Sequence, residues 1–362
     1  MSNSDIRVVP GPANYFSHPG SLERLSDFFN ADQLSRAVWV YGERALAGAE
    51  PFLPAAFHLP EAKKIRFTGH CSERDVAGLV QASGDDRAVV IGVGGGALLG
   101  SAKVLARRLG VPLVAIPTIA ATCAAWTPLS VWYSDAGQAL NFEIFDDANF
   151  LVLVEPRIIL NAPAEYLLAG IGDTLAKWYE AVVLAPQPKA LPLTVRLGIN
   201  GALAIRDVLL ASSETALADQ RRGDLTQAFR DVVEAIIAGG GMVGGLGERY
   251  TRVAAAHAVH NGLTVLPQTD KFLHGTKVAY GILVQSALLG QDDVLAQLVQ
   301  AYQRFNLPTT LAALEVDINN RAELDRVIAH TLRPGESIHY LPVTLTPEVL
   351  RAAFEKVEYF SR

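Results

Sequence analysis

Three segments in the second half of the chain carry side chains that could hold a metal ion. Asp173 follows a Gly-Ile-Gly run, His257 and His260 lie in an alanine-rich stretch, and His274 begins a further apolar run. Residues three apart share one face of a helix, so His257 and His260 would face the same way. One carboxylate and two imidazoles suit Zn²⁺ or Fe²⁺ and leave a coordination position for a substrate oxygen. These residue types therefore predict a metal centre.

Each of these residues also has an ordinary structural interpretation. A histidine in an apolar helix is often a hydrogen-bonded core residue, and an aspartate after glycine is often a helix N-cap. Lys177 follows Asp173 by one helical turn, so it either pairs with a substrate carboxylate in the metal pocket or forms an i,i+4 ion pair. The joint presence of the three segments on alanine- and glycine-lined helices, which leave room for a ligand, favours the metal.

A second candidate site lies in the first half of the chain, where three glycines follow a short apolar run. Residues 88–91 have the length of a buried strand, Gly94, Gly95 and Gly96 follow, and helical spacing begins at Leu98. Bare backbone lets phosphate oxygens approach the N–H groups, and the helix dipole favours their charge. The segment is not the GxGxxG fingerprint, and glycine clusters often serve only as tight turns. Because a further strand at 113–116 completes a strand-helix-strand unit, we interpret the turn as a dinucleotide cradle.

The elements around these sites divide the chain into two parts. Strand and helix patterns alternate through the first 160 residues, with strands expected at 6–9, 37–41, 64–67, 88–91, 113–116 and 150–154, and a turn at 135–137 between two hairpin arms. This alternation predicts a doubly wound, Rossmann-like parallel sheet. Helical periodicity dominates beyond it, at 166–184, 193–211, 225–243, 249–261, 276–289, 292–305, 321–332 and 346–357. We therefore predict an α/β dinucleotide-binding domain over 1–160 and an all-α, metal-binding catalytic domain over 161–362.

Composition excludes several functional classes. The 362 residues are 50% apolar with a net charge of −6, which argues against a nucleic-acid-binding face. Cys71 and Cys123 lack the spacing of a disulfide framework or a zinc ribbon. The N-terminus has no apolar core of signal-peptide length, and prolines interrupt the uncharged stretch between Arg108 and Asp135, which argues against a membrane span. We expect a cytoplasmic homo-oligomer that acts on a small molecule, with neither nucleic acid nor membrane as partner.

Motifs along nearly the whole chain resemble the iron-containing alcohol dehydrogenases, in particular their glycerol dehydrogenase branch. These motifs are Gly-Val-Gly-Gly-Gly at 92–96, Ala-Lys at 102–103, Pro-Thr-Ile-Ala at 117–120, Gly-Ile-Gly-Asp at 170–173, Ala-His-Ala-Val-His-Asn-Gly at 256–262 and His-Gly-Thr-Lys-Val-Ala at 274–279. Within the branch, the blocks at 11–20 and 124–133 resemble the bacterial 2-oxo acid reductases. The resemblance implies a nicotinamide cofactor and a divalent metal.

By the same resemblance, Asp173, His257 and His274 would be the metal ligands. Related enzymes with four protein ligands have a histidine where this chain has Lys177, and three ligands with an open position favour Zn²⁺ over Fe²⁺. His260 would pass a proton to the substrate or only support the ligands. The family's cofactor contacts would fall on Gly96, Ala97, Thr118, Ala121, Thr127, Leu129 and Tyr133. To these we add, as candidate cofactor-binding residues, Gly94 and Gly95 of the glycine turn and Gly42, Arg44 and Gly100.

Three departures from the branch bear on specificity. Gly42 replaces an aspartate that accepts hydrogen bonds from the adenosine ribose, and Arg44 follows, so NADP(H) is favoured over NAD(H) unless Arg44 simply faces solvent. Cys123 replaces an aspartate that contacts the polyol, which favours a carboxylate-bearing substrate unless the cysteine is only structural. Gly100 replaces an aspartate that bonds the cofactor ribose, a loss that would weaken cofactor affinity.

We therefore expect a metal-dependent oxidoreductase that transfers a hydride between NADP(H) and a 2-oxo acid such as 2-oxobutyrate or 2-oxoglutarate, or in reverse from a 2-hydroxycarboxylate. Two alternatives remain open at this point. One is a glycerol or other polyol dehydrogenase, or a glycerol-phosphate dehydrogenase, of the same superfamily. The other is a sensor that binds nucleotide through the glycine turn but catalyses nothing.

Overall fold

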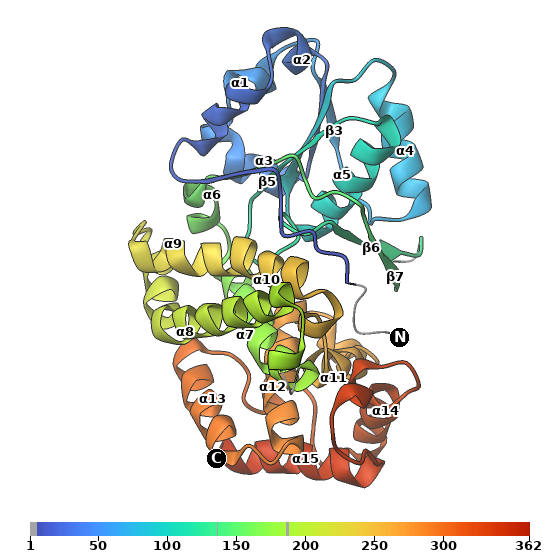
Figure 1. Cartoon of the computed structure of the whole chain (residues 1–362), viewed down its shortest axis with the longest axis vertical. Helices are drawn as coiled ribbons and strands as arrows, with labels where there is room; N and C mark the ends of the chain where they lie inside the picture. The colour runs from blue at the N-terminus through green and yellow to red at the C-terminus, as the bar shows by residue number, and fades with distance from the viewer. Residues whose placement is uncertain (1–5, 136, 186–187) are drawn as a thin grey trace. The chain divides into compact units, whose positions relative to one another are not determined.

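The computed structural model describes residues 6–135, 137–185 and 188–362, which pack into two compact units (Figure 1). The sheet unit comprises Val9–Pro163 and Asp219–Met242, and the helical unit comprises Ala164–Ala218, Val243–Arg362 and the described residues 6–8. These units differ from the expected domains 1–160 and 161–362 mainly in residues 219–242, which pack with the sheet unit. Hydropathy patterns show that a helix has an apolar face but not which unit that face packs against.

The sheet unit contains a six-stranded parallel sheet in the order β1-β8-β5-β4-β2-β3. Its strands are β1 (Asn14–Ser17), β2 (Ala37–Tyr41), β3 (Lys63–Arg66), β4 (Val89–Gly94), β5 (Leu113–Pro117) and β8 (Leu151–Val154). Every residue of β4, β5 and β8 is buried, as expected for strands whose two faces are covered. This sheet and the helical second half confirm the predicted fold class.

The strand order reverses between β2 and β4. From β2 the chain passes through α3 (Glu43–Ala49) outward to β3, returns through α4 (Glu73–Ser83) to β4 on the other side of β2, and continues through α5 (Gly96–Leu109) to β5. In open α/β sheets, ligands bind outside the carboxyl ends of the strands at such a reversal. The glycines after β4 and Gly42 after β2 both lie at this edge of the sheet.

The strand expected at 6–9 does not form. The described residues 6–10 have no regular structure, and the first strand is β1 instead. Pro10 and Pro12 have no N–H to donate to a ladder, so pairing with β8 begins only beyond them. The helix expected from 249 also begins later, at Ala255, because Ala254 adopts φ −141° and ψ −132°, outside the helical region. The pattern over 225–243 resolves into α9 (Gln227–Glu234), a π-helical turn (Ala235–Gly239) and α10 (Gly240–Gly247).

A two-stranded antiparallel sheet, β6 (Leu129–Tyr133) and β7 (Ala139–Ile144), forms the predicted hairpin. One residue of the expected turn at 135–137, residue 136, lies outside the described part of the chain. The hairpin is fixed to α5, because the hydroxyl of Ser130 donates a hydrogen bond to the carbonyl of Gly100 over 2.9 Å.

Two sets of contacts hold the segment 219–242 in the sheet unit. The amide of Gln220 donates to the carbonyl oxygens of Ile159 and Ala162, each over 3.1 Å. The ring of Trp126 occupies the space where a side chain at Gly241 or Gly11 would lie, and its indole N–H donates to the carbonyl of Pro10 over 2.8 Å. One indole thus joins three segments that are far apart in sequence.

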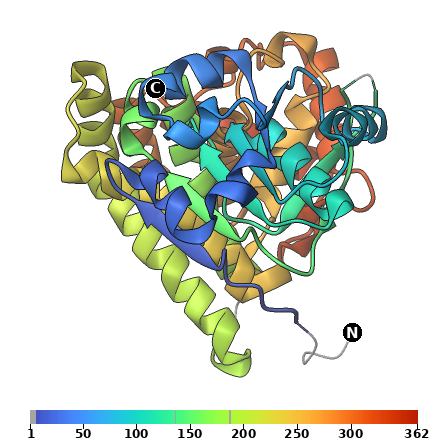
Figure 2. The same cartoon turned by 90° about the horizontal axis from the view of Figure 1, so that it is seen from above.

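The core of the helical unit is formed by α7 (Ala164–Leu184), α11 (Ala255–Leu263) and α12 (His274–Leu288). A side chain at Gly275 would overlap the backbone of Ala169 in α7, and one at Gly281 would overlap the backbone of Ala256 in α11. These two glycines let α12 approach both neighbours at backbone distance. Around this core lie α8 (Leu193–Arg222), visible in Figure 2, and α13 (Asp292–Phe305), α14 (Arg321–Thr331) and α15 (Pro347–Phe360).

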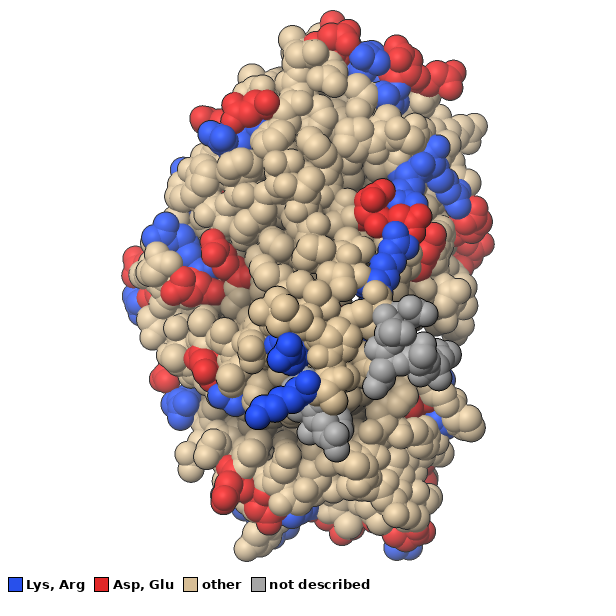
Figure 3. Space-filling view, in the orientation of Figure 1, with Lys and Arg blue, Asp and Glu red and all other residues tan. Residues whose placement is uncertain are grey.

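Acidic and basic side chains are interspersed on the face shown in Figure 3. Among the described helices, none combines the length and the apolar character needed to cross a bilayer.

Candidate metal centre and nucleotide turn

The close approach of α7, α11 and α12 brings Asp173, His257 and His274 together. The Oδ1 atom of Asp173 lies 3.2 Å from Nε2 of His274 and 3.6 Å from Nε2 of His257. Each residue offers one ligand atom, and these atoms lie within 4.8 Å of one another. Asp173 Oδ1 is buried and accepts no hydrogen bond from the described residues. A buried, unpartnered carboxylate oxygen facing two imidazole nitrogens fits a divalent cation.

Glu180 orients the ring of His257 by a contact at its Nδ1 atom. Its Oε2 lies 2.7 Å from Nδ1 of His257, and its Oε1 accepts the backbone N–H groups of Ala254 (2.7 Å) and His257 (3.1 Å). The carboxylate therefore fixes both the ring and the first turn of α11, leaving Nε2 directed at Asp173. Burial opposes protonation of His257, but Glu180 and Asp173 outweigh it and raise its pKa to about 9.

A second chain of contacts leads away from His274. Its Nδ1 lies 3.0 Å from Nε2 of His260, whose Nδ1 lies 3.0 Å from Oδ1 of Asn261. The Asn261 amide donates to Oε2 of Glu336 over 2.9 Å, and Arg333 pairs with Oε1 of Glu336 over 2.6 Å. Burial, followed by the adjacent His274, holds the pKa of His260 well below its ordinary value.

Lys177 lies one turn after Asp173 on α7, as the spacing predicts. Burial opposes ionisation of Asp173, but the two imidazoles and the positive charge of Lys177 leave the pKa of that carboxyl well below its ordinary value. The ammonium is therefore close enough to act on the metal-ligand set. Its role toward a substrate stays a prediction.

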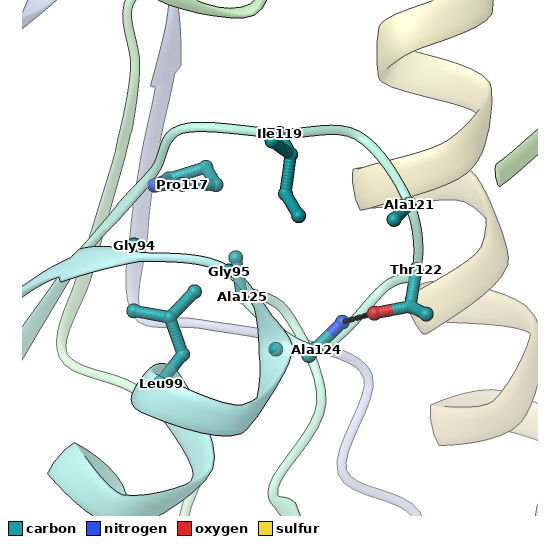
Figure 4. Close-up of a pocket in the computed structure, with 10 residues that line it drawn as sticks. Gly94, Gly95, Leu99, Pro117, Ile119, Ala121, Thr122, Ala124 and Ala125 are labelled. Carbon is teal, nitrogen blue, oxygen red and sulfur yellow. Dashed lines mark hydrogen bonds between the residues drawn. The ribbon is translucent and has the colours of Figure 1, made fainter. Parts of the chain in front are cut away.

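The glycine turn forms a second pocket, in the sheet unit. Gly94 ends β4, and Gly95 precedes the first residue of α5, whose first turn has no acidic residue and no side-chain cap. The pocket is lined by Gly94, Gly95, Gly96, Leu99, Pro117, Ile119, Ala121, Thr122, Ala124 and Ala125, and Figure 4 shows the loop after β5 arching over the turn. Uncapped N–H groups at a helix N-terminus beside bare backbone suit a phosphate.

Comparison with known proteins agrees with this arrangement. Residues 12–156 match the model of the family described as iron-containing alcohol dehydrogenase. Hydroxycarboxylate dehydrogenase A of Escherichia coli K12 is 79% identical over 360 residues, which cover 99% of each chain. A glycerol dehydrogenase of Pseudomonas putida is 34% identical over 96% of each chain.

The chain belongs to the iron-containing alcohol dehydrogenase family. The crystal structure of glycerol dehydrogenase from Schizosaccharomyces pombe matches it with a TM-score of 0.85 at 28% identity, covering 100% of this chain and 92% of the other. A probable glycerol dehydrogenase from Sinorhizobium meliloti 1021 gives the same score and identity, covering 98% and 99%. Family membership makes the chain a dehydrogenase, implies a nicotinamide cofactor and a divalent metal, and favours an enzyme over a non-catalytic sensor.

In this dehydrogenase the predicted cofactor residues other than Gly42 and Arg44 occupy three places. Gly94, Gly95, Gly96 and Ala121 line the pocket at the turn, and Ala97 lies in the first turn of α5. Thr118, Thr127, Leu129 and Tyr133 follow β5 in the loop and the hairpin. Gly100 lies under the hairpin instead, because Ser130 bonds its carbonyl. The cofactor role of these residues stays a prediction.

The carboxyl end of β2 carries Gly42 and Arg44, the residues from which a preference for NADP(H) is predicted. Gly42 precedes α3, and Arg44 is exposed in its first turn. Arg66 ends β3, pairs in register with Tyr41 of β2, and forms an ion pair with Glu43 over 3.2 Å. The sequence alone does not indicate Arg66, because β3 becomes a neighbour of β2 only through the sheet.

The loop that carries Cys123 is held by a buried lysine, Lys103, which the sequence motifs do not mark as a site residue. Cys123 is partly exposed and lies between two residues of the pocket. The ammonium of Lys103 donates to the carbonyl oxygens of Ala124 (2.6 Å) and Leu129 (2.8 Å). Burial lowers the pKa of Lys103 to about 7, against the opposing effect of the Cys123 and Cys71 thiols.

Proposed function

We propose that this dehydrogenase transfers a hydride between NADP(H) and a 2-oxo acid, or in reverse from a 2-hydroxycarboxylate, with Zn²⁺ as its metal. The observation that carries the proposal is the 79% identity to a hydroxycarboxylate dehydrogenase over 99% of both chains. The glycerol dehydrogenase of Pseudomonas putida shares 34%. A polyol substrate is therefore the second candidate.

Asp173, His257 and His274 would hold the cation. When bound, a divalent cation polarises the substrate carbonyl, and the nicotinamide carries the hydride. Asp173 supplies negative charge in a buried setting, and Glu180 would accept a hydrogen bond from Nδ1 of His257, so that Nε2 is the ring nitrogen available to the cation. Three protein ligands with an open position support Zn²⁺ over Fe²⁺.

The substrate carboxylate has two supports in this proposal. Lys177 would pair with it, since its charge already acts on Asp173. By the resemblance to glycerol dehydrogenases, Cys123 would replace an acidic residue, so that no carboxylate at this position would repel an anionic substrate. A Lys177→Ala variant with unchanged KM for 2-oxobutyrate would exclude the proposed role of Lys177.

The nucleotide would bind with its pyrophosphate on the N–H groups of the glycine turn. Arg44 and Arg66, at the ends of neighbouring strands, would attract the 2′-phosphate of NADP(H). An Arg44→Ala variant is expected to raise the Kd of NADPH about tenfold, the effect of one charge-assisted contact, and to leave that of NADH nearly unchanged. Equal effects on both nucleotides, measured by fluorescence titration, would contradict the NADP(H) preference.

The decisive experiment is a panel of substrates tested with NADPH and NADH in parallel. We expect NADPH oxidation with 2-oxobutyrate and 2-oxoglutarate, loss of activity with a chelator, and recovery when Zn²⁺ is restored. Faster NADP⁺ or NAD⁺ reduction with glycerol or glycerol phosphate than with any 2-hydroxy acid would favour the polyol or the phosphate-ester alternative.

A further inference from the structure

The hydrogen bonds behind His274 have only one consistent direction. Glu336 is paired with Arg333, so its carboxylate accepts hydrogen bonds and cannot donate one. The amide nitrogen of Asn261 donates to Glu336, which turns the amide oxygen toward His260. That oxygen also can only accept. The Nδ1 atom of His260 must therefore carry a proton.

The same constraint fixes the position of the proton on His274, one of the predicted metal ligands. A neutral His260 with a proton on Nδ1 has a lone pair on Nε2, and Nε2 lies 3.0 Å from Nδ1 of His274. A hydrogen bond over this distance requires the proton on Nδ1 of His274. His274 is then left with a lone pair on Nε2, the atom that faces Asp173 Oδ1 at 3.2 Å. This is the form of histidine that binds a cation through Nε2.

We infer that Glu336, acting through Asn261 and His260, is a positioning residue that sets the tautomer of the metal ligand His274. Glu180 places the proton of His257 on Nδ1 through one direct contact, and Glu336 places that of His274 on Nδ1 through two intermediate side chains. His260 is consequently engaged at both ring nitrogens, which assigns it to support of the ligand rather than to direct proton transfer to the substrate. The inference rests on the proposed metal site.

The variant Glu336→Gln tests this direction of the hydrogen bonds. The glutamine amide can donate to the oxygen of a rotated Asn261 side chain, whose nitrogen would then donate to His260 and reverse every proton in the chain. His274 would carry its proton on Nε2 and lose its lone pair toward the cation. We expect Glu336→Gln to weaken Zn²⁺ binding about tenfold, at the lower end of supporting-residue effects, as measured by competition with a chromogenic chelator.

Glu323→Gln is the matched control. Glu323 also accepts a side-chain amide, that of Gln268, over 3.0 Å, but it contacts no member of the histidine chain in the described hydrogen bonds. The control should bind Zn²⁺ like the unmodified protein. Equal affinity of the Glu336→Gln protein and the unmodified protein would overturn the inference.

The unmodified protein provides a second test, which does not depend on whether a variant folds. With ¹⁵N-labelled histidine and bound Zn²⁺, the nitrogen chemical shifts should report His260 and His274 with their protons on Nδ1. A proton on Nε2 of His260, with Zn²⁺ bound, would overturn the inference and leave the proposed function intact. A protein that binds no Zn²⁺ at all would overturn both.

Discussion

The two candidate sites of this dehydrogenase are built by opposite means. The nucleotide turn consists largely of backbone contributed by one continuous strand, turn and helix, β4 to α5, with the loop after β5 above it. The metal centre consists of side chains from three helices, with Asp173 and His274 far apart in sequence. A site made of backbone is impaired when a substitution adds side-chain atoms. A site made of side chains is impaired when a substitution removes one of its ligand groups. The following variants test this difference, beginning with the largest expected effect.

Replacing Asp173 by asparagine should abolish metal binding. The change removes the only negative charge of the three-ligand set and leaves its geometry nearly intact, so we expect at least a ~10³-fold loss of activity, comparable to removal of a major electrostatic contact. Metal content by mass spectrometry and kcat/KM measure the two effects. Asp207→Asn, at an exposed residue of α8, is the control. Normal metal content in Asp173→Asn would exclude it as a ligand.

Replacing Glu180 by glutamine should weaken metal binding without abolishing it. Glutamine keeps one oxygen for the backbone of α11 but no longer holds the His257 proton as a carboxylate does, so we expect a 10- to 100-fold higher Kd for Zn²⁺, about the range for such supporting residues. Glu165→Gln, in the first turn of the same helix, should have no effect. A Kd unchanged by Glu180→Gln would mean that the geometry of α11 alone suffices.

Replacing Gly95 by alanine should damage the other site alone. The added carbon would lie 2.8 Å from Cδ1 of Ile119, so Ile119 must shift within the small pocket. We expect about a tenfold higher Kd for NADPH, roughly one lost phosphate contact, with Zn²⁺ binding unchanged. Gly48→Ala in α3 adds its carbon to open space and serves as the control. Unchanged affinity for NADPH would argue against phosphate binding at this turn.

The buried Lys103 of the sheet unit should make the stability of the protein depend on pH. Its pKa is about 7 in the folded protein, against an ordinary lysine value of 10.5, so between these pH values the unfolded chain binds a proton that the folded chain does not. The free energy of unfolding should therefore rise with pH over this window, by up to ~1.4 kcal/mol per pH unit, and the contribution should level off below pH 7.

Urea unfolding between pH 7.5 and 9.5 measures this slope. Lys103→Met should reduce the slope relative to the unmodified protein, whereas Lys63→Met, at an exposed position of β3, should not. Identical slopes in all three proteins would mean that Lys103 stays protonated when folded.

The sequence predicted the nucleotide turn better than the metal centre's surroundings. Strand, turn and helix from β4 to β5 are contiguous, so their order along the chain already gives their arrangement. The ligand types were recognisable, but their convergence depends on the packing of α12 at Gly275 and Gly281. For Glu180 the sequence does contain one indication of a role at the metal centre, because Glu180 lies two helical turns after Asp173 on the same face of α7.

Other residues that support the two sites are not indicated by any local sequence pattern. Glu336 reaches Asn261 across 75 residues of sequence, and Arg66 lies beside the end of β2 only because β3 pairs there. The segment 219–242 shows the same limit on a larger scale. Its periodicity predicts helices, yet its membership in the sheet unit depends on Gln220 and on Trp126, which helical periodicity does not reveal.

The indole of Trp126 gives this dehydrogenase a built-in optical probe. Its ring borders the nucleotide loop, is hydrogen-bonded at Pro10 and is enclosed beside Gly11 and Gly241. With phenylalanine in place of the other three tryptophans, Trp39, Trp132 and Trp178, the fluorescence would come from this ring alone. Any rearrangement of the loop when the coenzyme arrives would then register as a change in emission, on a timescale that stopped-flow mixing can follow.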